Sequence, residues 1–174
     1  MTSKKASVVL QDDDVIFAEF SAFEDQIRQQ LLASVKHTEK KVFPRTEAFD
    51  FDAELKKKNT FLYCTVHQAG GIAHRTVSLI GYLVCVRMKR VTLLHKVCVR
   101  EQFRRRGNAK AMLAQLEQEV RKQSCNEIQL WVDEEREPAR YLYASCDYEE
   151  VDRVENYYGP GRTGLKMVRK IQQD

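Results

Sequence analysis

Long apolar runs and low-complexity blocks are both missing from this sequence of 174 residues. Hydrophobic residues make up 43% of the chain and charged residues 31%, a balance typical of a soluble globular protein. The apolar patch from Ala6 to Leu10 is too short for a signal peptide or a membrane anchor. We therefore expect a single domain over residues 1–174, located in the cytoplasm or nucleus, with no membrane partner.

The five cysteines lack the spacing of a metal site or a disulfide framework. They are odd in number and widely separated, and Cys64, Cys85 and Cys98 stand in apolar, strand-like runs. A small buried thiol is the usual occupant of such positions. The sequence predicts neither a bound metal nor a disulfide.

No segment concentrates positive charge in the manner of a nucleic-acid-binding protein. The net charge is +4 and the pI is near 8.8, but acidic residues are interspersed almost throughout. The run Lys56–Lys58 is typical of a solvated helix end. We expect no nucleic-acid partner.

The first third of the chain has helical periodicity. Apolar residues recur at spacings of three and four from Ile16 to Val35, and Asp12–Asp14 is a helix-start signal. The predicted helix ends near Phe43-Pro44, because proline disfavours helical geometry in the residue before it. A strand is expected at residues 6–10 and a short helix at residues 52–58.

Alternating and apolar segments dominate the remainder, with a turn expected at Gly70-Gly71. Strands are predicted at residues 60–66, 77–88, 90–99, 128–132, 149–156 and 164–171, and helices at residues 107–123 and 137–146. The predicted fold is α/β (α+β), with a mixed central sheet of six or seven strands and about four helices. Residues 157–162 are expected to form a loop.

The stretch from Val97 to Lys110 organises this pattern. An apolar strand passes through three arginines into a small-residue turn, and a helix follows. Gly107 and Ala109 let backbone N–H groups approach an anion, and the helix directs its free N–H groups to the same place. The arginines add charge-assisted hydrogen bonds. These residues predict a diphosphate-binding turn.

The same turn resembles the acetyl-CoA motif of the GCN5-related N-acetyltransferase (GNAT) superfamily, Arg/Gln-x-x-Gly-x-Gly/Ala. Here the motif is Arg104-x-x-Gly107-x-Ala109. Leu130-x-Val132, Pro138-Ala139-Arg140 and Leu142-Tyr143 resemble the strand and helix that follow it in the family. The likeness runs from about His95 to Met167, with an acetyl-CoA core at about residues 95–148, and it implies the GNAT fold, acetyl-CoA as acetyl donor and a primary amine as acceptor.

The resemblance also assigns the cofactor-binding residues. The backbone of Val97 and Val99 would pair with the pantetheine arm, and an N–H near Cys98 or Val99 would face the thioester carbonyl. The diphosphate would lie on the turn, which consists of Arg104, Arg105, Arg106, Gly107, Asn108, Ala109 and Lys110.

Tyr143 stands where the family has the tyrosine that donates a proton to the departing thiolate; otherwise it is a core aromatic. A glutamate or histidine is frequent in the later strand, but this chain has Trp131 there. His95 is the candidate base, with Glu134, Glu135 or an ordered water held near Tyr157 or Tyr158 as alternatives. Two further departures are Arg136 in place of asparagine and Asp147-Tyr148 in place of Gly-Phe, the second keeping an aromatic plug.

Phe43-Pro44 and Tyr157-Tyr158 resemble the acceptor pocket of N-terminal acetyltransferases, which modify the α-amine of proteins. Each pair also has a simpler interpretation, as a helix stop and as a packed hairpin or dimer contact. The predicted acceptor is a protein or peptide N-terminus. Arylalkylamines or polyamines remain alternatives, as does a non-catalytic acyl-CoA-binding or adaptor protein. The sequence leaves monomer and homodimer open.

Overall fold

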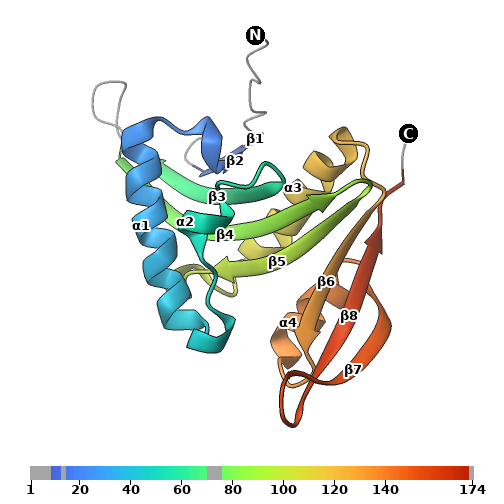
Figure 1. The fold of residues 1–174 in the computed structure, drawn as a ribbon. Coiled ribbons are helices and arrows are strands. Elements are labelled where there is room, and N and C mark those ends of the chain that lie inside the picture. The colour runs from blue at the N-terminus through green and yellow to red at the C-terminus, as the bar shows by residue number, and fades with distance from the viewer. Residues whose placement is uncertain (1–8, 13–14, 70–75, 173–174) are drawn as a thin grey trace. The chain divides into compact units, whose positions relative to one another are not determined.

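The computed structural model describes residues 9–12, 15–69 and 76–172 (Figure 1). Its strands are β1 (Val9–Asp12), β2 (Val15–Glu19), β3 (Thr60–Ala69), β4 (Thr76–Met88), β5 (Val91–Val99), β6 (Glu127–Asp133), β7 (Glu149–Gly159) and β8 (Arg162–Lys170). Its α-helices are α1 (Asp25–Val42), α2 (Phe51–Glu54), α3 (Asn108–Lys122) and α4 (Glu137–Ala144). The eight strands are hydrogen-bonded in the order β1-β2-β3-β4-β5-β6-β8-β7.

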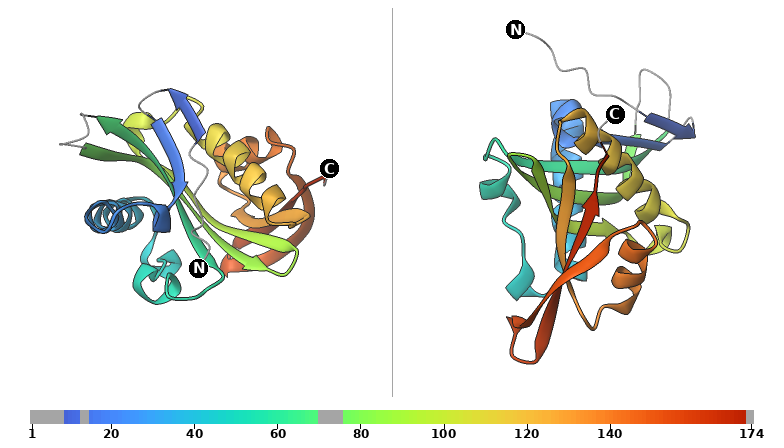
Figure 2. Two further views of the ribbon diagram at one scale, coloured as in Figure 1. Left: turned by 90° about the horizontal axis from the view of Figure 1, so that it is seen from above. Right: turned by 90° about the vertical axis from the view of Figure 1, so that its right-hand side faces the viewer.

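The chain divides into two compact units, the first made of residues 1–84 and 96–108. In this unit α1 and α2 cover one face of the strands, as Figures 1 and 2 show. The apolar face of α1 buries Leu31 and Val35 against Leu62 of β3 and Tyr82 of β4. β2 pairs antiparallel with β3, which places Phe17 opposite Thr65. This core fixes the end of β5 beside α1.

The second unit is made of residues 85–95 and 109–174. β5 and β6 run parallel from the pair Val91–Glu127 to the pair Leu94–Leu130. A parallel pair needs a crossover connection, which α3 supplies. β8 then pairs antiparallel with both β6 and β7. The buried face of α3 consists of Met112, Leu113, Gln115, Leu116 and Val120.

The helix predicted from about residue 12 begins later than expected. Val15–Glu19 forms strand β2, and α1 starts at Asp25. Ile16 and Phe20 still pack against the core of the first unit, as does Ile27 of the helix. The apolar spacing was therefore real, but β-branched and aromatic residues at this point pair with β3 instead of continuing a helix.

The other predicted elements are present, with shifted ends. α1 ends at Val42 as expected, with Phe43 in extended geometry before the proline, whereas α2 is shorter than residues 52–58. β7 continues to Gly159, so Tyr157 and Tyr158 lie in a strand and not in the predicted loop. The described sheet has eight strands because β2 is added to those predicted, while β1 overlaps the strand expected at residues 6–10, of which residues 6–8 lie outside the described residues. The fold class is confirmed, and the Gly70-Gly71 turn lies outside the described residues.

All five cysteines are free thiols, and those at 64, 85, 98 and 125 are buried. Within the described ranges, no three or more His, Cys, Asp or Glu side chains form a group suited to a metal ion. No helix among the described residues is both long and apolar enough to cross a membrane.

Candidate active site

The turn after β5 has an unusual backbone. A short 3-10 turn (Glu101–Phe103) is followed by positive φ angles at Arg105 (59°) and Gly107 (77°) before α3 begins at Asn108. A Cβ placed on Gly107 would meet no atom within 4 Å, so this position faces open space. A left-handed arginine costs about 1–2 kcal/mol, and such strain is frequently found at functional sites.

The residues of this turn fall into two groups. Arg104 Nε donates a hydrogen bond of 2.9 Å to the Val99 carbonyl, and Asn108 Nδ2 donates one of 2.8 Å to the Phe103 carbonyl. Both side chains therefore help to shape the turn. Arg105 and Arg106 are exposed and have no ion pair within the described part of the chain, and the first turn of α3 has no acidic residue. The free positive charge is concentrated at these two arginines and the helix start.

The backbone direction of β5 agrees with the role predicted for Val97 and Val99. The Arg100 N–H donates to the Ile80 carbonyl of β4 at 2.9 Å. Because backbone groups alternate along a strand, Cys98 also faces β4, while Val97 and Val99 face the opposite edge. The register of β5 with β6 ends at Leu94, before these two valines.

A buried ionic cluster that the sequence did not predict lies beside this strand. Lys96 Nζ is 3.0 Å from Glu39 Oε1, and the two side chains are only 9% and 5% exposed. Glu39 also accepts a hydrogen bond from the Tyr82 hydroxyl. Lys96 Nζ donates to the Glu47 carbonyl and lies 3.8 Å from the centre of the Phe43 ring. Lys96 thus fixes Phe43, a predicted acceptor residue, to the end of β5.

Cys98 is not suited to carry an acyl group. Burial raises the pKa of its thiol, although a hydrogen bond with Tyr82 and the positive charge of Arg104 act in the opposite direction. The nucleophilic form of cysteine is the thiolate, which burial disfavours here.

Tyr143 lies on α4 and is 9% exposed. Burial raises the pKa of its phenol, an effect that the nearby positive charge of Arg136 partly offsets. Its hydroxyl forms no hydrogen bond within the residues that the structure describes, so its proton is uncommitted. The ring lies 5.7 Å from that of Tyr148, the expected aromatic plug, which is buried. Asp147 before it adopts a positive φ of 59°, the geometry that the family's glycine would favour.

The predicted acceptor tyrosines belong to an aromatic stack on β6 and β7. The rings of Trp131 and Tyr157 are stacked 4.2 Å apart at 13°, and Tyr158 meets Tyr157 edge-on. Arg162 lies over Tyr158 and forms a 2.6 Å ion pair with Asp133. Burial acts to raise the pKa of Asp133, but the Glu135 N–H and the Arg162 guanidinium outweigh it and lower that pKa. The ring of Trp131 therefore holds Tyr157 in place by stacking, and Tyr157 in turn contacts Tyr158.

The candidate bases remain predictions. His95, which would otherwise be interpreted as a half-buried structural histidine, is exposed on β5. Glu134 is held by Arg153 at 3.0 Å, whereas Glu135 is exposed.

The family model of the GNAT acetyltransferases matches residues 28–148 of the chain. The chain therefore belongs to the GNAT acetyltransferase family. It is an acetyl-CoA-dependent N-acetyltransferase that acts on an amine acceptor. No curated protein sequence is significantly similar to it.

Solved structures share the fold at low sequence identity. The Arabidopsis thaliana NAA60 complex with acetyl-CoA is 17% identical, with a TM-score of 0.69 over 90% of this chain and 98% of that one. The ribosomal-protein-S18-alanine N-acetyltransferase of Escherichia coli is 14% identical, with a TM-score of 0.69 over 92% and 96%. An aminoglycoside 6′-N-acetyltransferase complexed with coenzyme A is 17% identical, with a TM-score of 0.68 over 91% and 98%. Neighbours with such different acceptors establish the fold and leave the acceptor open.

Proposed function

We propose that this enzyme acetylates the α-amine of a protein or peptide N-terminus. The observation that carries the proposal is the stack of Trp131, Tyr157 and Tyr158, in which Tyr157 is held against Trp131 and yet remains 45% exposed. An ordered, half-exposed aromatic surface suits an extended peptide better than a small amine, because it offers both apolar contact and hydroxyl groups. One of the similar solved structures is named as a ribosomal-protein-S18-alanine N-acetyltransferase, and another is the NatC complex bound to Gag peptide and CoA.

The residues of the turn fit the diphosphate of acetyl-CoA. Arg105 and Arg106 offer charge that no carboxylate neutralises within the described ranges, and Gly107 leaves space for close approach. Val97 and Val99 would hold the pantetheine arm through their backbone groups. When bound, acetyl-CoA supplies an acetyl group activated as a thioester.

The proposed reaction is direct attack by the amine on the thioester carbonyl within a ternary complex. The backbone N–H of Val99, which faces away from β4, would stabilise the carbonyl oxygen as it gains charge, a contribution of about 3 kcal/mol in enzymes that use such a donor. Tyr143 would give a proton to the leaving thiolate. His95, Glu135 or an ordered water would take the proton of the attacking amine.

A panel of acceptors tests the proposal. Release of free CoA is measured with peptides that have a free α-amine, with the same peptides blocked at the N-terminus but carrying lysine, and with arylalkylamines, polyamines and an aminoglycoside. The proposal requires the free α-amine peptides to give the highest kcat/KM. A higher value for any small amine, or for the blocked peptides, would contradict it.

We also propose that the enzyme is located in the cytoplasm or the nucleus. Imaging of the tagged chain in cells tests this location.

A further inference from the structure

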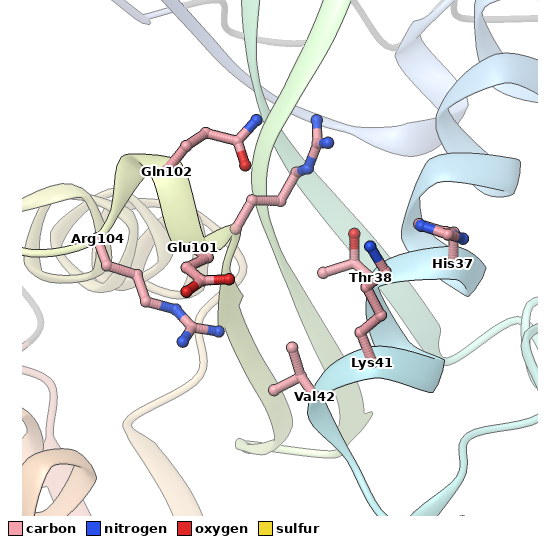
Figure 3. A pocket seen from close by; sticks show the side chains of 8 residues that line it. His37, Thr38, Lys41, Val42, Glu101, Gln102 and Arg104 are labelled. Carbon is pink, nitrogen blue, oxygen red and sulfur yellow. The ribbon is translucent and has the colours of Figure 1, made fainter.

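A cleft of about 350 Å³ opens between the last turns of α1 and the turn after β5. His37, Thr38, Lys41 and Val42 line it from α1, and Arg100, Glu101, Gln102 and Arg104 line it from the other wall. Figure 3 shows the labelled side chains of the two walls directed towards the space between them. All these residues belong to the first compact unit.

Positive charge predominates in this cleft and is not neutralised. Lys41, Arg100 and Arg104 line it together with a single carboxylate, that of Glu101. Within the described part of the chain, none of the three cations forms an ion pair with a carboxylate. A cleft with unpaired cations on both walls is suited to an anionic group.

The two arginines are also held in place. Arg100 donates to the Leu79 carbonyl at 3.2 Å, and Arg104 donates to the Val99 carbonyl at 2.9 Å. Neutral carbonyls orient the guanidinium groups without cancelling their charge. A planar guanidinium fixed in this way loses little side-chain freedom when it binds a carboxylate.

The position of the cleft indicates whether its anion would belong to the acceptor or to the cofactor. Val42 in its wall is followed directly by Phe43, which Lys96 holds against β5. The diphosphate turn predicted from the sequence includes Arg104, which the structure shows bonded to the Val99 carbonyl and lining the cleft, but its exposed cations Arg105 and Arg106 do not line the cleft. The cleft therefore adjoins the predicted acceptor wall.

We infer that this cleft is a specificity subsite for an acidic side chain near the N-terminus of the acceptor. The inference rests on the proposed function and deepens it, because it names the charge of the preferred acceptor. Lys41 and the two arginines bind the carboxylate, and Glu101 limits its affinity. A cationic subsite also excludes polyamines as preferred acceptors.

Matched peptides and two neighbouring lysines test this inference. Peptides with Asp at the second, third or fourth position are compared with otherwise identical Asn peptides. The wild-type enzyme prefers Asp at one or more of these positions by about tenfold in kcat/KM, the scale of a charge-assisted hydrogen bond. Lys41→Gln lowers this ratio at least about threefold, and Glu101→Gln raises it. Lys40→Gln leaves the ratio unchanged, because Lys40 shares the last turn of α1 but does not line the cleft.

The outcomes separate the subsite from the proposed function. Acetylation of Asp and Asn peptides at equal rates overturns the subsite and leaves the function standing. If no peptide is acetylated, peptide binding to the CoA-saturated protein is measured by calorimetry. Tighter binding of the Asp peptide than of the matched Asn peptide supports the subsite. Equal binding of the two peptides, or no binding of either, overturns it. A loss of CoA affinity in Lys41→Gln assigns the cleft to the cofactor and also overturns the inference.

Discussion

Gly107 and Gly161 have nearly the same backbone, with φ angles of 77° and 75°, and a Cβ added at either position would meet no atom within 4 Å. Only Gly107 lies in the predicted diphosphate turn. Glutamate at either position would cost about 1–2 kcal/mol in backbone strain. We expect Gly107→Glu to abolish acetyl-CoA binding in calorimetric titration and Gly161→Glu to retain it. Unchanged affinity in Gly107→Glu would refute the role of the turn.

Tyr143 and Tyr141 lie on the same helix, but Tyr143 is 9% exposed and Tyr141 is 78% exposed. We expect Tyr143→Phe to lower kcat by about a hundredfold or more, because the leaving thiolate loses its proton donor. The affinity for acetyl-CoA should change little, since the variant removes only a hydroxyl. Tyr141→Phe is the control and should behave as wild type. Equal turnover in both variants would leave Tyr143 with a packing role only.

The turn could be predicted from the sequence because its signals are local: Gly107, the arginines and the helix start lie within a few residues of each other. The Lys96–Glu39 pair could be predicted only in part. Glu39 stands four residues after Val35 on the buried face of α1, which indicates a buried carboxylate that needs a partner. The identity of that partner depends on tertiary contacts, as does the choice of Phe43 as the ring under Lys96.

The β7–β8 hairpin positions its aromatic stack through Gly164. A Cβ on Gly164 would lie 2.7 Å from Cγ of Tyr157, closer than such atoms can approach. We expect Gly164→Ala to displace Tyr157 from Trp131 and to destabilise the protein by about 1–3 kcal/mol. Because the single tryptophan, Trp131 of β6, is stacked on Tyr157, its fluorescence reports the displacement of Tyr157. The destabilisation should disappear when Gly164→Ala is made in a Tyr157→Ala background; a cost that persists there would rule out the clash.

α1 and β5 are joined by the ion pair of Glu39 and Lys96, with side chains 5% and 9% exposed. Removing one partner of a buried pair costs about 3–5 kcal/mol, because the other charge is left without compensation. We expect this loss for Lys96→Met in chemical denaturation. The double variant Lys96→Met/Glu39→Gln should recover part of it. If the loss in the double variant equals the sum of the losses in Lys96→Met and Glu39→Gln, the two charges are not coupled.

The boundary between β2 and α1 shows why element types could not all be predicted. Apolar spacing from Ile16 to Val35 fits a helix throughout, and both Ile16 and Phe20 do contact the core. Strand β2 forms because β3 offers an edge about fifty residues later in the chain. Periodicity identified the residues that are buried, whereas pairing with a distant strand decided their conformation.

At the scale of the whole molecule, neither compact unit is a continuous piece of chain. The division falls within two strands, at Val84/Cys85 in β4 and at His95/Lys96 in β5, and again at Asn108/Ala109 where α3 begins. β4 and β5 each contribute residues to both units, so loss of strand pairing in one unit also disorders the same strand in the other unit. We therefore expect the two units to unfold together, as a single domain would.

Two probes measure this cooperativity independently. Trp131 fluorescence reports the second unit alone, because it contains the single tryptophan, while far-ultraviolet circular dichroism reports the helices of both. We expect equal denaturant midpoints for the two signals. Acetyl-CoA at a hundred times its Kd should stabilise the protein by about 2.7 kcal/mol and shift both midpoints together. Separate midpoints would show that the units unfold independently, and a shift confined to one signal would show that acetyl-CoA stabilises one unit without the other.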